Sequence, residues 1–218
     1  MPFEFTLISR IVPALAQGLY LTLALSALAI VLAAAWGIPV VLGLMSKFRP
    51  LGVLTRAYIE IVRNTPVLVQ MYFIFFGSAI LGYAFSGFVA GLIALTLQNG
   101  AYIAEIYRAG IQSISQRQTE AGLAIGLTPG ATFRIVILPQ ALRKVIPPLS
   151  NQGVVIIKDT ALVATLSVAE LTFQARLLAD RTAAVYEIFL TLALFYIVIT
   201  SAFAGLMRLV EWRLRVVQ

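Results

Sequence analysis

Residues 19–44 read LYLTLALSALAIVLAAAWGIPVVLGL, a run of 26 residues without a charged side chain. As a straight α-helix this run is about 39 Å long, because each residue adds about 1.5 Å. The hydrocarbon core of a bilayer is about 30 Å thick, and about 20 apolar residues cross it. The run is therefore long enough and apolar enough to span a membrane, and it predicts an all-α membrane protein.

The composition of the whole chain agrees with this prediction. Of the 218 residues, 61% are hydrophobic and 11% are charged, whereas soluble domains are about half apolar and a quarter charged. A sizeable soluble domain is therefore excluded. The chain contains no Cys and no His, which excludes cysteine nucleophiles, thiolate zinc sites, disulfides and histidine catalysis. No pair of carboxylates resembles a catalytic dyad, so we expect neither an enzyme nor a metal site.

Five apolar stretches predict five spans within a single transmembrane domain over residues 1–218. The predicted spans cover residues 19–44, 51–81, 85–106, 146–171 and 185–207. The second stretch would be about 46 Å long as a straight helix, which exceeds the bilayer core. Because Arg63-Asn64-Thr65-Pro66 interrupts it, we expect a bend there, with Thr65 capping a new helix that has Pro66 at its first position. Residues 1–15 alternate apolar and polar side chains, which predicts a short interfacial helix and no cleaved signal peptide.

The basic residues predict the orientation in the membrane. In the five-span arrangement twelve Lys and Arg residues fall on one side, and only Arg10, Arg176 and Arg181 fall on the other. Basic residues mark the cytoplasmic side, so we expect the N-terminus outside and the C-terminus in the cytoplasm. The net charge of +7 is explained in this way without a nucleic-acid partner. The polar segment of about residues 107–143 then lies in the cytoplasm.

The local sequence of this cytoplasmic segment predicts two short helices. Gly126 can end the first helix in a left-handed conformation. Thr128 can cap the second helix, with Pro129 at its first position. Pro139 is expected to end the second helix, because proline lacks the backbone N–H and its ring clashes with the preceding turn.

The first of these two helices has the character of a docking element. Ala121 and Gly122 are small, so another backbone can approach closely, and Glu120 offers a carboxylate beside them. We interpret the helix as an element that docks into a groove on a partner. The alternative is a charged loop that merely connects two spans.

These residues resemble the cytoplasmic signature of ABC importer permeases. That signature reads Glu-Ala-Ala, then Gly four residues after the last Ala, and Ile-x-Leu-Pro after nine more residues. This chain has Glu120-Ala121-Gly122, Gly126 and Val136-Ile137-Leu138-Pro139, with Gly122 in place of Ala and Val136 in place of Ile. Further stretches resemble the polar amino-acid subfamily: RNTPVLVQ at 63–70, GAYIAE at 100–105, RAGI at 108–111, LPQA at 138–141 and KDTAL at 158–162, where Ala161 replaces the usual Ser. The matches occur in the family's order and extend over about residues 17–210.

The resemblance implies a five-span permease core of the type I ABC importer kind, in the bacterial inner membrane. It implies a second permease chain, identical or homologous, two cytoplasmic ATPase subunits, and an extracytoplasmic solute-binding protein that delivers a polar amino acid. Residues that would couple the permease to the ATPase are Glu120, Ala121, Gly122, Gly126, Leu138 and Pro139. ATP and Mg²⁺ would bind the ATPase, because this chain has no Gly-x4-Gly-Lys-Ser/Thr phosphate loop, and we expect no cofactor in it.

The fourth predicted span carries a polar sector. Asn151, Lys158 and Thr165 recur every seven residues, and Gln152 and Asp159 form an adjacent row. Polar groups inside a span are costly and by default functional, so Asn151, Lys158, Asp159, Thr160 and Thr165 are candidates for the substrate path. The alternative is a polar contact that only holds helices together. We expect Asn99 of the third span to lie across the same cavity, although an Asn at that depth is also typical of a helix–helix hydrogen bond.

The Glu60/Arg63 and Glu105/Arg108 pairs are each three residues apart and predict interfacial ion pairs.

The sequence leaves two questions open, the charge of the substrate and the class of transporter. The substrate's charge is undecided, because Asp159 favours a cationic amino acid and Lys158 an acidic one. The competing function is a secondary transporter or channel subunit that needs no ATPase. Such a protein is expected to have an inverted repeat or charges in several spans, and no repeat is visible.

Overall fold

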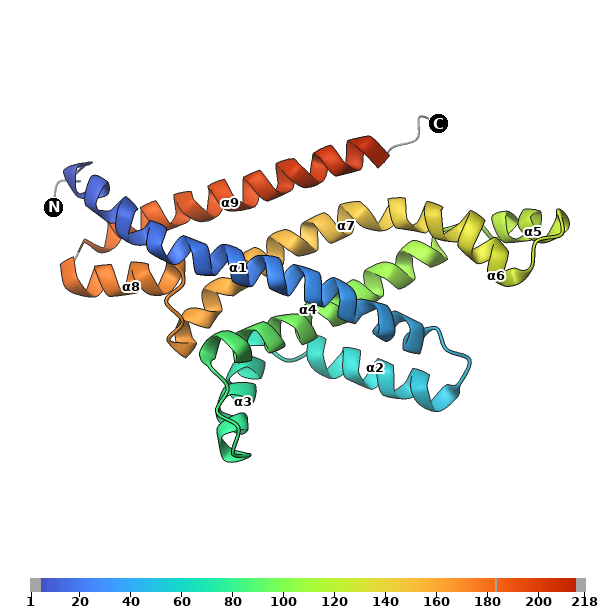
Figure 1. Cartoon of the computed structure of the whole chain (residues 1–218), viewed down its shortest axis with the longest axis horizontal. Helices are drawn as coiled ribbons and strands as arrows, with labels where there is room; N and C mark the ends of the chain where they lie inside the picture. Colours follow the sequence, from blue (N-terminus) through green and yellow to red (C-terminus); the bar gives the residue numbers. More distant parts are fainter. Residues whose placement is uncertain (1–4, 183, 215–218) are drawn as a thin grey trace.

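The computed structural model describes residues 5–182 and 184–214, and all regular structure in these two ranges is helical (Figure 1). The elements are α1 (Phe5–Leu44), α2 (Arg49–Arg63), α3 (Val67–Ile80), α4 (Gly87–Gln112), α5 (Gln116–Ala124), α6 (Pro129–Thr132), the π-helical segment η1 (Phe133–Ile137), α7 (Leu138–Asp159), the 3₁₀ segment η2 (Thr160–Leu166), α8 (Leu171–Thr182) and α9 (Val185–Leu214). The long helices α1, α4, α7 and α9 run along the molecule. We call the end that carries α5 and α6 the loop end, and the opposite end the α8 end.

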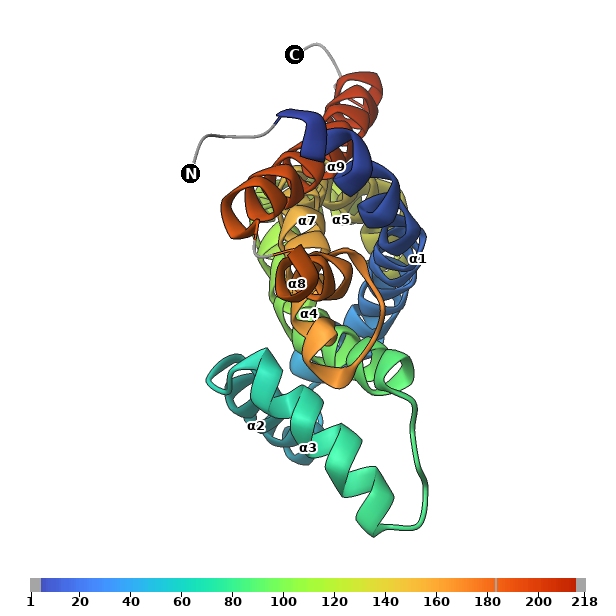
Figure 2. The ribbon, with the colours of Figure 1, turned by 90° about the vertical axis from the view of Figure 1, so that its left-hand side faces the viewer.

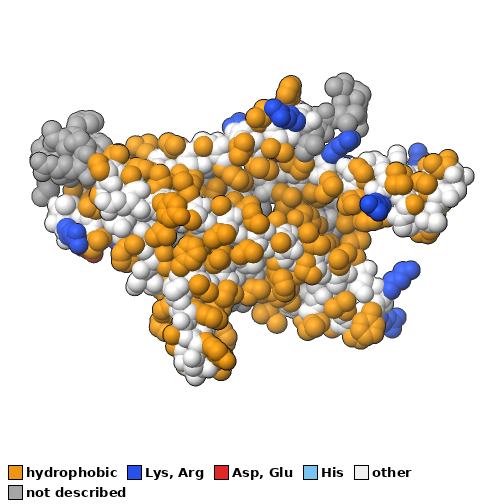
Figure 3. Space-filling view, viewed as in Figure 1, with side chains coloured by type: hydrophobic (Ala, Val, Ile, Leu, Met, Phe, Trp, Pro, Cys, Tyr) orange, Lys and Arg blue, Asp and Glu red, His pale blue; other side chains and the backbone are white. Residues whose placement is uncertain are grey.

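Within residues 5–182 and 184–214, three helices are individually long and apolar enough to cross a membrane, which supports a multi-span protein. They are Ile11–Leu44 in α1, Gly87–Gln112 in α4 and Val185–Arg213 in α9. The bent pair formed by α2 and α3 has the composition of a fourth span. Hydrophobic side chains are spread over the whole face seen in Figure 3, and most of the Lys and Arg side chains visible there lie toward the loop end.

The predicted separate helix over residues 1–15 is wrong for the residues that the structure describes, because α1 is continuous from Phe5 to Leu44. Pro13 lies inside this helix and does not break it. On either side of Pro13, Ile11 and Leu15 are buried in a cluster with Leu171 of α8 and Ile188 of α9. This packing holds the helix together across the proline, and prolines are tolerated in spanning helices where neighbouring groups compensate.

The predicted bend in the second apolar stretch is confirmed, with an angle of 104° between α2 and α3. The predicted cap is wrong, since the hydroxyl of Thr65 donates backward to the carbonyl of Ile61 (2.8 Å) and makes no cap for α3. Instead, Nε2 of Gln70 lies within hydrogen-bond distance of the carbonyls of Val62 (2.9 Å) and Thr65 (3.1 Å). A side chain of α3 thus compensates backbone acceptors that the break leaves free. Figure 2 shows that α2 and α3 project from one side of the bundle.

The helix boundaries near the loop end and α8 end differ from the predicted ones. α4 continues to Gln112, and α7 already begins at Leu138, so both long helices extend into the segment that was predicted to lie in the cytoplasm. α7 ends at Asp159, which is 12 residues before the predicted end of the fourth span. The chain then passes through η2 and a left-handed Ser167 (φ 60°) before α8 begins. α9 confirms the fifth predicted stretch.

Candidate functional site

The α5 helix at the loop end is closed by hydrogen bonds at both ends. The hydroxyl of Ser115 accepts from the backbone N–H of Arg117 at its start (3.4 Å). At its end the N–H of Gly126 donates to Leu123 (3.0 Å) and the N–H of Leu127 donates to Gly122 (3.1 Å). These two hydrogen bonds together form the Schellman motif, which needs a residue in the left-handed backbone conformation. Gly126 supplies it with φ +85°, which confirms the predicted conformation.

The predicted start of α6 is confirmed, whereas its predicted end is wrong. The hydroxyl of Thr128 accepts from the N–H of Ala131 (3.3 Å), and Pro129 lies in the first turn. Pro139 does not end the helical path, because it lies in the first turn of α7, directly after η1. In η1 the hydrogen bonds reach back five residues, as from the N–H of Leu138 to the carbonyl of Phe133. The wider π turn just before Pro139 lets the helical path continue to a residue that has no N–H to donate.

Gly122 holds α5 against α6 and explains a departure from the family signature. Gly122 is buried, and a Cβ placed on it would lie 2.6 Å from Cγ2 of Thr132. Thr132 is itself only 1% exposed. An alanine at this position, as in the usual signature, would therefore collide with the Thr132 side chain that fills the space here.

Most of the other residues of α5, and Ile125 directly after it, are exposed. Glu120 and Ala121 are exposed, and so are Leu123 (44%) and Ile125 (77%). Leu138 is half-buried and Pro139 exposed at the return to α7. Exposed apolar side chains next to a carboxylate, on a short helix with fixed ends, form a surface suited to docking another protein.

Asn99 is buried between two helices and is not open to a cavity. It is 1% exposed, its Nδ2 donates to the carbonyl of Leu95 (2.8 Å), and its Oδ1 accepts from Nε2 of Gln152 (2.6 Å). Asn99 of α4 and Gln152 of α7 therefore make the interhelical contact that was the alternative to a ligand contact. The prediction that Asn99 faces the substrate cavity is not supported by these contacts.

The remaining polar candidates of the fourth predicted span are only partly brought together. Asn151 and Lys158 are exposed and Asp159 is half-buried. Thr165 lies in η2, beyond the end of α7, so it does not continue the seven-residue row of one helix. Thr160 is fully buried and donates to Ile157 (2.7 Å). In the part of the chain with described side chains, neither Lys158 nor Asp159 has an ion-pair partner within 4 Å.

Sequence reasoning missed Glu170, which is fully buried (0% exposed) at the α8 end. Its Oε1 accepts from the N–H of Phe173 (2.8 Å), and its Oε2 is near the hydroxyls of Tyr196 (3.2 Å) and Thr22 (3.3 Å). These donors come from α8, α9 and α1. A Cβ on Gly18 would lie 2.7 Å from the carbonyl carbon of Glu170, so α1 and the start of α8 touch through backbone. We call Glu170, its three donors Thr22, Phe173 and Tyr196, and the backbone contact at Gly18 the Glu170 clasp. A lone carboxylate in an otherwise apolar stretch was the signal that could have revealed it.

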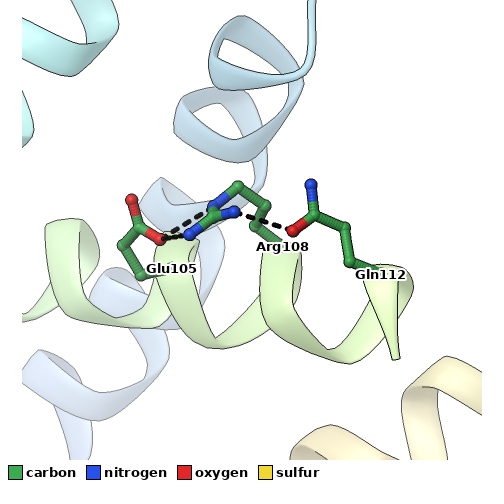
Figure 4. Close-up of polar contacts among 3 residues, drawn as sticks. All are labelled: Glu105, Arg108 and Gln112. Carbon is green, nitrogen blue, oxygen red and sulfur yellow. Dashed lines mark hydrogen bonds and ion pairs between the residues drawn. The ribbon is translucent and has the colours of Figure 1, made fainter. Parts of the chain in front are cut away.

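A cleft with charged walls lies between α2 and α4 near the loop end. On α4, Arg108 donates to Glu105 (2.6 and 2.8 Å) and to Gln112 (2.7 Å), as Figure 4 shows. This confirms the predicted Glu105–Arg108 ion pair. The predicted Glu60–Arg63 pair is wrong: the one ion pair among the described side chains is Glu105–Arg108. The Arg63 guanidinium instead lies over the ring of Tyr102, 4.8 Å from its centroid, where a cation–π attraction replaces the ion pair.

Comparisons with known proteins match almost the whole chain. Residues 35–216 match the family described as "Binding-protein-dependent transport system inner membrane component". The chain is 38% identical over 227 residues to the glutamine transport system permease protein GlnP of Escherichia coli (strain K12), covering 99% of this chain and 100% of that protein. It is 38% identical over 184 residues to the probable glutamine ABC transporter permease protein GlnM of Bacillus subtilis (strain 168), covering 84% and 85%.

A solved structure supports the same assignment. The chain superposes with a TM-score of 0.92 on a chain in the crystal structure of an amino acid ABC transporter with histidines, to which it is 36% identical. The superposition covers 98% of this chain and 100% of that one. The chain belongs to the family of binding-protein-dependent transport system inner membrane components and is a permease subunit of an amino-acid ABC importer.

Proposed function

We propose that the chain carries a polar amino acid across the bacterial inner membrane in five spans, with the loop end in the cytoplasm. The spans are α1, the bent α2–α3 pair, α4, α7 and α9. The N-terminus is then outside and the C-terminus in the cytoplasm. The excess of basic residues toward the loop end supports this orientation. α7 is less apolar than the spanning helices α1, α4 and α9, because it carries polar side chains. Such a helix fits a span that lines a water-filled path.

The observation that carries the proposal is the outward face of α5. Its ends are fixed by the Ser115 cap and the Schellman turn at Gly126, so the exposed Glu120, Ala121, Leu123 and Ile125 form a pre-shaped surface. This surface docks on an ATPase subunit, which binds ATP and Mg²⁺, while the permease chain itself holds no cofactor. Gly122, Leu138 and Pro139 act behind the surface by positioning α5 relative to α6 and α7.

Two further partners complete the importer. A second permease chain, identical or homologous, faces this one, and an extracytoplasmic solute-binding protein delivers the substrate to the α8 end. Relatives whose names specify glutamine permeases, at 38% identity, support L-glutamine as the first substrate to test. We assign the exposed Asn151 and Lys158 and the half-buried Asp159 to the substrate path along α7, because their side chains are accessible there.

Reconstitution with the ATPase and the binding protein tests the proposal. We expect uptake of labelled L-glutamine into proteoliposomes only when ATP is supplied on the loop-end side and the ATPase is intact. A hydrolysis-deficient ATPase is the control for non-specific leakage. Uptake that persists without ATP would support the secondary transporter or channel instead, and uptake of another amino acid in a wider panel would correct the substrate alone.

A further inference from the structure

Two consecutive prolines lie inside α7, and they leave backbone carbonyls without their helical donors. The carbonyl of a helical residue accepts from the N–H four positions on, or from the N–H three positions on in a tighter turn. For Lys144 both of these positions are proline, Pro147 and Pro148, and proline has no N–H. The carbonyl of Arg143 loses its usual donor in the same way, because Pro147 is four positions on. α7 therefore carries two adjacent carbonyls that lack the donors of a regular helix.

These two carbonyls lie on the exposed side of α7. A helical carbonyl points along the axis toward the residue four positions on, so the carbonyls of Arg143 and Lys144 point toward Pro147 and Pro148. Both prolines are exposed, and so is Asn151 one turn further along. The space into which the carbonyls point is therefore accessible from outside the chain.

The surface around these carbonyls does not suit contact with lipid tails. Within α7, all of whose residues the structure describes, the exposed large hydrophobic side chains are Leu142 and Val155. On α9 such side chains recur along the helix, among them Leu194, Ile197 and Val198. A carbonyl without a donor is costly in contact with hydrocarbon. The exposed side of α7 therefore suits water or a polar ligand, whereas that of α9 suits lipid.

Asn151 adds a polar side chain to the two carbonyls. It follows the two prolines by four and three positions, which places it on the same face of the helix. Side chains on a helix lean toward its N-terminus, so the Asn151 side chain leans toward the prolines. The charged side chains of Arg143 and Lys144 lean away from them, toward the loop end, where Nζ of Lys144 donates to the carbonyl of Ser113 (2.9 Å). Uncharged oxygen acceptors from three residues thus converge beside the prolines.

We propose that the two freed carbonyls and Asn151 bind the α-ammonium group of the amino acid as it passes along α7. The proposal rests on the proposed function and adds a substrate site to it. An ammonium group has three N–H donors, which matches the two carbonyls and Oδ1 of Asn151. Carbonyls that an interrupted helix releases serve as cation ligands in other transporters.

The position of the site along α7 defines what it recognises. Pro148 precedes Asp159 by 11 positions, so the site lies about 16 Å from Asp159 along the helix axis, nearer the cytoplasm. The path then offers acceptors for the ammonium group at two levels. Because every α-amino acid carries this group, the site recognises the class of substrate and not its side chain.

Restoring the missing donor tests the site. In Pro148→Ala the new N–H bonds to the carbonyl of Lys144, which removes an acceptor and completes the helix. Binding of labelled L-glutamine to the permease–ATPase complex in nanodiscs is measured by equilibrium dialysis without the binding protein, whose own affinity then does not enter. We expect about tenfold weaker binding, as for the loss of one hydrogen bond to a charged group. The melting temperature should not fall, because alanine favours a helix more than proline does. Unchanged binding overturns the site.

A second ligand identifies the group that is bound. The glutamine analogue in which hydrogen replaces the α-ammonium group competes with labelled glutamine. The wild type should prefer glutamine about tenfold, and Pro148→Ala and Asn151→Ala should each reduce this preference, whereas a merely structural defect weakens both ligands alike. A wild type that transports glutamine but does not prefer it here, or a preference that both variants retain, overturns the proposal. Glutamine binding that requires Na⁺ and ignores the ammonium group assigns the carbonyls to a metal ion and also overturns it.

Pro39→Ala is the matched control. Pro39 also lies inside a helix, α1, and is exposed, but it stands alone, so the carbonyl of Ala35 keeps the donor three positions on. Its exposed neighbours Ile38 and Leu42 are apolar. This variant should keep the preference of the wild type, and an equal loss of preference would show that α7 is not the site. A wild type without ATP-dependent uptake of any amino acid refutes the proposed function, whereas uptake with an unchanged preference in Pro148→Ala refutes the site alone.

Discussion

The two ends of the molecule place their carboxylates in opposite environments. At the α8 end Glu170 is fully buried, and donors from α1, α8 and α9 surround it. Near the loop end Glu60 is exposed at the edge of a cleft and has no ion-pair partner among the described side chains. Separating the helices around Glu170 would leave buried polar groups unpaired, which is costly. Glu60 lies in contact with solvent, so the comparison sets a carboxylate that joins three helices against one that joins none by an ion pair.

The strongest way to break this comparison is to remove the buried carboxylate. We expect Glu170→Ala to lower the free energy of unfolding by about 3 kcal/mol, because three buried donors lose an acceptor at about 1 kcal/mol each. Thermal unfolding of the purified permease in detergent measures this loss. Glu120→Ala is the control, since Glu120 is exposed and such a change costs about 0.5 kcal/mol or less. Equal melting temperatures for both variants would show that the Glu170 clasp does not stabilise the α8 end.

The backbone contact of the Glu170 clasp gives the second prediction. In Gly18→Ala the new Cβ would lie 2.7 Å from the backbone of Glu170 and Leu171. Because backbone cannot move aside as a side chain does, α1 and α8 must separate, at a cost of about 2 kcal/mol. The melting temperature again reports the change. Gly205→Ala is matched to it, because nothing lies within 4 Å of a Cβ at Gly205, and it should unfold like the wild type. A stable Gly18→Ala variant would mean that α1 and α8 can adapt at this contact.

The third prediction concerns the loop end, where we expect function to fail before stability. Gly126→Val places a β-branched residue at φ +85°, which costs about 1–2 kcal/mol in the turn that closes α5. The variant should still reach the membrane, but it should bind the ATPase less well or stimulate it less. Substrate-stimulated ATP hydrolysis and co-purification of the ATPase measure this effect.

Gly130→Ala provides the control for the turn. Like Gly126, Gly130 has open space where a Cβ would lie, but its φ is not in the left-handed region. We therefore expect this variant to support ATP hydrolysis and transport as the wild type does. Normal transport with normal ATP hydrolysis in Gly126→Val would contradict the proposed coupling role of α5.

The sequence predicted several of the features that depend on neighbouring residues, although the Thr65 cap and the Glu60–Arg63 pair were wrong. The left-handed Gly126, the Thr128 cap and the Glu105–Arg108 pair each involve residues within a few positions of one another, and the structure confirms all three. The bend between α2 and α3 follows in the same way from Thr65-Pro66.

The features that the sequence did not predict depend on distant parts of the chain. Glu170 meets Thr22, which is 148 positions away, and no local pattern records that distance. The Arg63 side chain lies over Tyr102 of another helix, so helical spacing within α2 could not predict its partner. The end of α7 at Asp159 also escaped prediction, because the apolar residues of η2 continue the hydrophobic run while the helix does not.

The last and smallest predicted effect concerns a third carboxylate, Asp159. Its exposure lies between that of the buried Glu170 and that of the exposed Glu60: it is half-buried at the end of α7, and it has no ion-pair partner among the described side chains. Asp159→Asn removes the charge and keeps the shape, so no buried partner loses its acceptor, and assembly and basal ATP hydrolysis should be unchanged. If the carboxylate meets the substrate's ammonium group, Asn keeps an acceptor but loses the charge, which lowers the hydrogen bond's contribution by about 1–1.4 kcal/mol, and uptake should fall about fivefold to tenfold.

The Asp180→Asn variant separates this effect from a general loss of charge. Asp180 is exposed on α8, so this variant should transport normally. The assays are uptake of labelled L-glutamine and size-exclusion chromatography of the assembled importer. An Asp159→Asn variant that fails to assemble would place Asp159 with Glu170, as a carboxylate that holds helices together. A variant that assembles but transports poorly would place it with the groups that meet the substrate. The distinction rests on assembly, because a group that holds helices together is needed before any substrate arrives.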